Sequence, residues 1–236
     1  MRPDPLSGAV TELQSVAGSQ LDAISINLNV ARPQRRLFLA ANCTFGRSLD
    51  EADTPFSLPA NTYDLGAERG PALGYPRHRL MSMVNLPLRK RFRLGTSLRA
   101  QSALPYNITT GRDDNGDTVS NDRPAGVSRN SGLGRAQIDL GLRLSWGIGF
   151  GGPAAPPAGP QIRILRGDNA DPLGGMGGGL DGQNKRYTVE LYAQSYNTLN
   201  HTNALNFSGV VTSPFYGQPT SAASPRRVEV GTRFSF

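Results

Sequence analysis

The chain has one cysteine, two histidines and no long apolar run. The single cysteine, Cys43, excludes an intrachain disulfide and a cysteine metal cluster. His78 and His201 are too few for a typical zinc site unless carboxylates complete it. No run of about 18 apolar residues occurs, and the opening MRPDPLSGAV has no apolar core of the secretory kind. On these helical criteria alone, the sequence would be assigned to a soluble protein.

Lysine is also scarce, since all but two of the 25 basic residues are arginine. The formal charge of +7 could serve nucleic acid, but the arginines are spread along the chain rather than clustered, so we expect no nucleic-acid partner. Only 37% of the residues are hydrophobic, whereas 28 glycines and 18 prolines favour turns and irregular loops. Stretches that would build helices are correspondingly rare.

What the chain has instead is alternation of apolar and polar residues, which predicts strands with one apolar and one wet face. Several runs reach the roughly ten residues that a tilted strand needs to cross a bilayer. A weaker eighth run covers 11–17. The fold class predicted is all-β, an antiparallel transmembrane β-barrel segment of about seven to eight up-and-down strands. The seven well-marked runs are 23–30, 37–45, 79–88, 92–101, 136–146, 187–196 and 228–236.

The connections between these runs alternate in length, as in outer-membrane barrels with short periplasmic turns and long external loops. Short turns follow Val30 and Leu88, and long loops cover 47–77, 106–134 and 197–225. Residues 147–184 break the rule, because they fall on the short-turn side yet are long. Their glycine and proline content predicts a periplasmic-side linker.

Aromatic residues gather at the predicted periplasmic strand ends, in the apolar phase, although aromatics are only 7% of the chain. Rings of this kind prefer the lipid–water boundary, so the row predicts an aromatic girdle. The opposite phase carries mid-strand charges of both signs, which a wet interior would solvate. A soluble antiparallel sheet with one solvated face would show the same alternation and stays open. The girdle residues are Phe92, Trp146, Tyr187 and Phe236.

Three stretches carry a more specific signal: YDLGAERGPALGYPRHRLMSMVNLPL, SALPYNITTGRDDNGDTVSNDRPAGVSRNSGLG and SPFYGQPTSAASPRRVEVGTRFSF. Together they resemble the C-terminal barrel portion of TonB-dependent outer-membrane receptors, in the Oar-like branch with a carboxypeptidase-regulatory-like domain. The terminal Phe234 and Phe236 also resemble the signal read by the barrel-assembly machinery. The resemblance spans nearly the whole chain, and residues 1–236 are expected to be one barrel segment without a plug domain.

The resemblance implies a barrel of about 22 strands closed by a plug, in the bacterial outer membrane. Neither a plug nor the remaining strands are visible here, so we expect a C-terminal fragment, not competent alone. The implied function is uptake of a scarce solute, a metal chelate or oligosaccharide, without enzymatic activity. The implied partners are outer-membrane lipid and lipopolysaccharide, the barrel-assembly machinery, and the missing N-terminal barrel and plug, through which TonB acts. A soluble or surface β-sandwich binding module and a small passive porin-like pore are the alternatives.

The loops hold the candidate binding residues. Aromatic side chains there could stack on a solute or pack on one another: Tyr63, Tyr75, Tyr106, Phe207, Phe215 and Tyr216. The stretch 113–122 is dense in oxygen ligands suited to calcium, namely Asp113, Asn115, Asp117 and Asp122. An ordinary Asx-rich turn explains the same residues, and otherwise no cofactor is expected.

No functional role is predicted for the two histidines or the cysteine. His78 and His201 are read as ordinary residues at loop–strand boundaries, without the neighbours of a catalytic triad. Cys43 falls in the apolar phase of its strand and is expected to be buried or lipid-facing.

Overall fold

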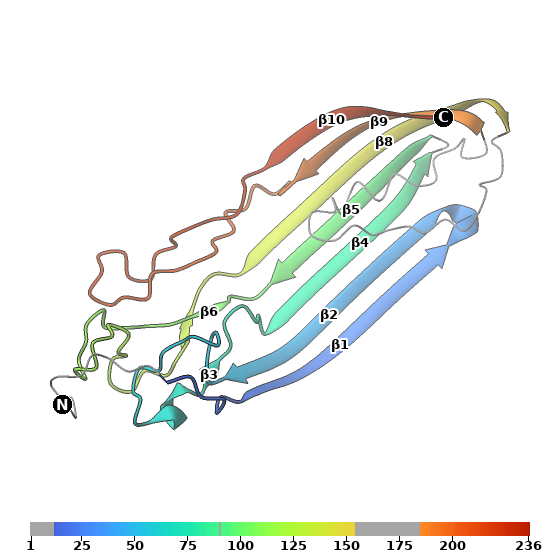
Figure 1. Ribbon diagram of the computed structural model, residues 1–236. Coiled ribbons are helices and arrows are strands. Elements are labelled where there is room, and N and C mark those ends of the chain that lie inside the picture. Colours follow the sequence, from blue (N-terminus) through green and yellow to red (C-terminus); the bar gives the residue numbers. More distant parts are fainter. Residues whose placement is uncertain (1–11, 90, 154–184) are drawn as a thin grey trace.

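The computed structural model describes residues 12–89, 91–153 and 185–236. Seven long strands form one antiparallel sheet in which each strand pairs with the next long strand along the chain (Figure 1). All seven predicted strands are confirmed, and with them the all-β, up-and-down class. They are β1 (Ser19–Arg32), β2 (Leu37–Asp50), β4 (His78–Arg89), β5 (Phe92–Gln101), β8 (Gln137–Pro153), β9 (Lys185–Tyr196) and β10 (Arg227–Ser235).

The remaining elements are short and lie in the connections. β3 (Gly70–Pro71) adds to β2, and β6 (Pro105–Tyr106) pairs with β7 (Gly132–Leu133). Two 3-10 turns, η1 (Pro33–Arg35) and η2 (Leu65–Glu68), complete the described structure. Within the described residues, no helix has the length and apolar character to span a membrane.

The two ends of the sheet differ, as the sequence predicts (Figure 1). At one end β1 turns into β2 through η1, and β4 ends at Arg89 while β5 begins at Phe92. At the other end the connections 51–77, 102–136 and 197–226 are long. The C-terminus lies at the short-turn end (Figure 1). Every long described loop therefore emerges on the same side of the sheet.

Two predicted boundaries are wrong. Residues 12–18 form no strand, so the weak eighth run does not extend the sheet within the described part. The linker predicted over 147–184 begins too early, because β8 continues to Pro153. Ile148 and Phe150 stay in the apolar phase and pair with Val189 and Tyr187 of β9, which prolongs the ladder through the glycine-rich segment. Residues 154–184 lie outside the described structure.

The apolar face of the sheet is exposed and the polar face is buried, which is the reverse of the arrangement in a water-soluble protein. We define the apolar face as the phase of Val230 and Ile138, and the polar face as the phase of Arg143 and Glu190. Val230 is 82% exposed, whereas Arg143 is only 3% exposed. No second sheet covers the apolar face among the described residues, so the β-sandwich alternative finds no support. A water-soluble sheet buries its apolar face, and this one does not.

Candidate functional site

The polar face carries a network of charged and amide side chains across β8, β9 and β10. Arg143 donates through Nη1 to Oε1 of Gln194 at 2.7 Å and through Nη2 to Oε1 of Glu190 at 3.1 Å. Its guanidinium also stacks on the Tyr192 ring, 3.9 Å from the ring centroid. Gly231 lies opposite Tyr192 in the register, and a β-carbon there would come within 2.5 Å of the Tyr192 hydroxyl. The glycine therefore makes room for the ring.

The network continues to the edge strand β10. Gln194 donates to the Tyr196 hydroxyl at 2.8 Å and to Oε2 of Glu229 at 2.7 Å. Arg227 in turn pairs with Glu229 at 2.8 Å. Of these residues Arg143 and Glu190 are buried, and buried charges are stable only when they are paired and hydrogen-bonded, as these two are. The polar face is thus suited to bordering water or a polar solute.

A second polar cluster joins two of the long loops and centres on Arg129. The Arg129 guanidinium donates from Nε to the Glu68 carbonyl at 2.6 Å and from Nη1 to Oδ1 of Asp53 at 2.6 Å. Its Nη2 donates to the Asp50 carbonyl at 2.7 Å and also contacts the Asp50 carboxylate. Burial lowers the pKa of Arg129, but an arginine remains protonated near neutral pH. One side chain thereby fastens loop 102–136 to loop 51–77.

Two neighbours strengthen this junction. Asn130, fully buried, donates from Nδ2 to Asp53 at 2.8 Å and to the Pro71 carbonyl at 3.0 Å. Arg123 makes a forked pair with the buried Glu68 carboxylate at 2.8 and 3.0 Å. Bidentate pairs of this kind fix orientation as well as contributing energy. We call Arg123, Arg129, Asn130, Glu68 and Asp53, with Asp50, the loop clamp.

The third loop, 197–226, crosses over loop 102–136. Thr109 donates to the Gly209 carbonyl at 3.0 Å, and Val211 donates back to the Thr109 carbonyl at 2.9 Å. A β-carbon on Gly209 would lie 1.7 Å from the Asn107 carbonyl oxygen, so only glycine permits this approach. At its base the loop is tied to β8, because Asn203 bonds both the N–H and the carbonyl of Ile138. The three long loops therefore form one connected platform.

The predicted loop aromatics divide into two groups. Tyr106 and Phe207 stack on each other with ring centroids 5.6 Å apart, and burial together with nearby Tyr216 raises the pKa of Tyr106. These rings join two loops and present only part of their surface. Tyr63 and Phe215 are 91% and 66% exposed. The remaining positions are Tyr75, whose hydroxyl lies against Gly46 of β2, and the exposed Tyr216.

The predicted calcium ligands form turns instead of converging on one point. The Asp113 carboxylate accepts the backbone N–H groups of Gly116, Asp117 and Thr118 at 2.7–3.0 Å. Asp122 likewise accepts from Asp114 and from Asn115, at 2.6 and 3.1 Å. No group of three or more metal-binding side chains suited to an ion occurs in the described part of the chain. Calcium binding stays a prediction, and the geometry adds nothing to it.

The predicted girdle residues lie on the apolar face at the short-turn end. Phe92 and Trp146 are paired across β5 and β8. Tyr187 belongs to a row of stacked rings that also includes Phe150, Phe234 and Phe236, with successive centroids 5.6–6.1 Å apart. This row runs over β8, β9 and β10. Aromatic rings at this position match a band at a lipid–water boundary.

Sequence reasoning missed the loop clamp altogether. The charged residues of β8–β10 are noticeable from alternation, but Arg129 and Glu68 lie in irregular loops and stand 61 residues apart. No periodicity marks such residues. Arginines and acids spaced through two glycine-rich loops are the only local sign of a clamp.

Residues 1–229 match a family model described as an outer membrane beta barrel domain. A search of the curated proteins finds no match to the chain.

Proposed function

Because the chain belongs to the outer membrane beta barrel domain family, and therefore to the bacterial outer membrane, we propose that it is the C-terminal wall segment of a TonB-dependent receptor that imports a scarce solute. The segment contributes wall and external loops and no catalytic step. The apolar face contacts outer-membrane lipid, and the polar face borders the interior. The girdle from Phe92 to Phe236 lies at the periplasmic boundary.

The loop platform is the observation that carries this proposal. A pore needs only a wall, whereas the loop clamp and the crossing at Gly209 hold three long loops in one arrangement. Preorganised loops reduce the entropy lost on binding a solute. The exposed rings of Tyr63 and Phe215 supply apolar contact area on that platform. A receptor for a metal chelate or an oligosaccharide can capture its solute on exposed rings held in this way.

The sheet edges support a larger barrel. In the described residues β1 pairs only with β2, and β10 only with β9. An unpaired strand edge in hydrocarbon leaves N–H and C=O groups without partners, at several kcal/mol each by order of magnitude. We therefore assign β1 and β10 to pairing with the strands of the missing barrel portion. Phe236, which is 94% exposed, is the residue offered to the assembly machinery.

The test is uptake by cells. A strain deleted for the gene is complemented with the wild-type gene and grown on limiting ferric chelates or oligosaccharides, with and without a protonophore. We expect one solute to require the gene, and its uptake to stop when the proton-motive force is dissipated. Uptake that continues with the protonophore contradicts the proposal.

A second measurement distinguishes the receptor segment from a small passive pore. The full chain is purified from outer membranes with any strands that accompany it and placed in a planar bilayer. The proposal expects no steady ion-sized openings and expects further barrel strands to copurify. Steady openings from the 236-residue chain alone would assign it to a small porin-like pore.

A further inference from the structure

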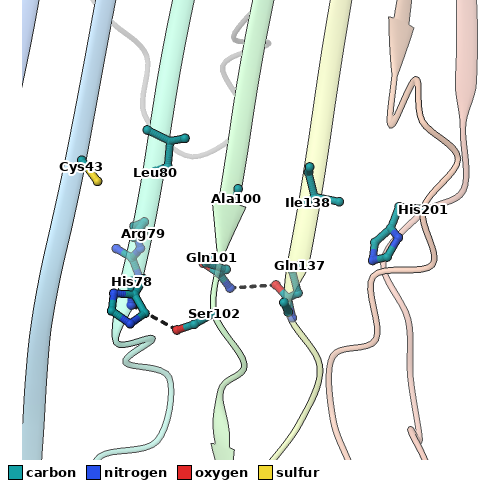
Figure 2. A pocket seen from close by; sticks show the side chains of 11 residues that line it. Cys43, His78, Arg79, Leu80, Ala100, Gln101, Ser102, Gln137, Ile138 and His201 are labelled. Atoms are coloured by element: carbon teal, nitrogen blue, oxygen red, sulfur yellow. Dashed lines mark hydrogen bonds between the residues drawn. The ribbon is translucent and has the colours of Figure 1, made fainter.

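A groove of about 520 Å³ lies on the apolar face, near the long-loop end (Figure 2). One residue from each of β2, β4, β5 and β8 forms its floor at a single level of the sheet: Cys43 pairs with Leu80, Leu80 with Ala100, and Ala100 with Ile138. The small side chains of Cys43 and Ala100 leave the floor low between their larger neighbours. The volume falls in the range of about 300–1,000 Å³ typical of small-molecule sites.

Both histidines of the chain line this groove, although 78 and 201 are far apart in sequence. Figure 2 shows His78 and His201 on opposite sides of β5 and β8. The His78 backbone is bonded in both directions to Ser102 at 2.9–3.1 Å, and its ring packs edge-on against Phe45. The His201 backbone is held by Asn197 at 2.9–3.0 Å. His78 begins β4 and His201 lies in loop 197–226, as the sequence predicts, and the groove brings the two together.

The chemistry of the lining selects the kind of occupant. The floor is apolar, and the rest of the lining includes two imidazoles and Arg79 but no carboxylate. An apolar tail with an anionic or strongly accepting head therefore fits. Under the proposed function this face contacts lipid, and the long-loop end lies at the outer leaflet, so the head would lie at the polar boundary and the tail in hydrocarbon.

We propose that this groove seats one acyl chain of an outer-leaflet lipid whose phosphate accepts hydrogen bonds from the His78 and His201 rings. The proposal rests on the proposed function, because it requires the apolar face to contact lipid. It adds that one lipid is bound at a defined place.

The native thiol provides the test. The full chain, with any strands that copurify, is placed in vesicles of digalactosyldiacylglycerol, which has no phosphate, with increasing phosphatidic acid. The rate of Cys43 alkylation by N-ethylmaleimide is then measured. With phosphatidic acid at about ten times its Kd, only about one-eleventh of the grooves still hold an exchanging galactolipid chain, so alkylation should slow by up to about tenfold. The double variant His78→Ala/His201→Ala should show no such slowing.

Two further variants control for protection of the thiol outside the groove and for misfolding of the histidine variant. In the Cys43→Ala/Leu191→Cys protein the thiol lies on the apolar face of β9, outside the groove, and its rate should not depend on phosphatidic acid. If the histidine variant fails to fold, Ala100→Leu raises the floor and should abolish the phosphatidic acid dependence. Equal slowing at both thiols, or no slowing at Cys43, overturns the proposal. Rapid reaction of both thiols with a charged, membrane-impermeant maleimide would instead contradict the lipid-facing apolar face itself.

Discussion

Replacing Arg129 by methionine should loosen the attachment of loop 102–136 to loop 51–77 without disturbing the sheet. Methionine matches the length of the arginine stem but cannot donate the bonds to Asp50, Asp53 and the Glu68 carbonyl. The loops would lose these three contacts, whereas the Arg123–Glu68 pair and the Asn130–Asp53 bond would remain. The strands, whose ladders do not involve Arg129, should remain paired.

The magnitude follows from burial. Removing one partner of a buried ion pair costs about 3–5 kcal/mol. The Asp50 and Asp53 side chains are 19% and 24% exposed, so water can solvate them in part after the change. We therefore expect about 2–4 kcal/mol in the free energy of loop opening, since charge-assisted bonds are worth about 1.5–3 kcal/mol each before such compensation. At 1.4 kcal/mol per factor of ten, this is a roughly 30- to 700-fold increase in opening.

Hydrogen exchange of peptides from the two loops measures that opening directly. Arg69→Met is the matched control, because the Arg69–Glu51 pair is longer, at 3.4 Å, and Arg69 is 45% exposed. An exposed pair contributes about 0–1 kcal/mol, so exchange in the control should rise by no more than about fivefold. If Arg129→Met accelerates exchange no more than Arg69→Met does, the loop clamp does not hold the platform together.

Three further outcomes test the platform and the apolar face. Gly209→Ala places a β-carbon 1.7 Å from the Asn107 carbonyl oxygen, so the loop crossing must open and limited proteolysis of loop 197–226 should increase by about tenfold or more. The pKa of Tyr106 is raised in the folded protein, so Tyr106 contributes its full stabilisation below about pH 10, the pKa of an unfolded tyrosine, and this stabilisation is lost as pH rises through the folded-state pKa. In an absorbance titration the Tyr106 phenolate should form at a higher pH than that of a free tyrosine. In the Tyr216→Phe variant it should form at a lower pH than in the wild type. Val230→Arg puts a charge on the apolar face at a cost of about 2–4 kcal/mol near the bilayer midplane, and the amount assembled in the outer membrane should fall.

Each of these has a control. Gly152→Ala meets no atom within 4 Å of its new β-carbon and should leave proteolysis unchanged. Tyr63→Phe removes a fully solvated hydroxyl and should not move the Tyr106 titration. Arg227 on β10 already projects from the polar face at 63% side-chain exposure, so Arg227→Ala should assemble normally. Assembly of Val230→Arg at wild-type levels would mean that β10 does not face lipid.

The strands could be predicted because their signal is local. In the segment 136–146 every second residue is apolar, and period-two alternation has one structural meaning in an extended chain. The same logic placed Arg143 and Glu190 on one face and Val230 on the other. The linker boundary at 147 was wrong because glycine suggests a loop, whereas Ile148 and Phe150 keep the phase and the neighbouring strand supplies the bonds.

Alternation and loop length encode the wall: which residues form strands, which side of each strand is apolar, and which connections are long. The contacts among the loops are not encoded in this way. Arg129 reaches Glu68, Asp53 and Asp50, and His78 comes to share a groove with His201, because the meander brings loops from distant segments to one end of the sheet. Contacts between irregular segments depend on where the strands place them in space, and no periodicity within either segment encodes that position.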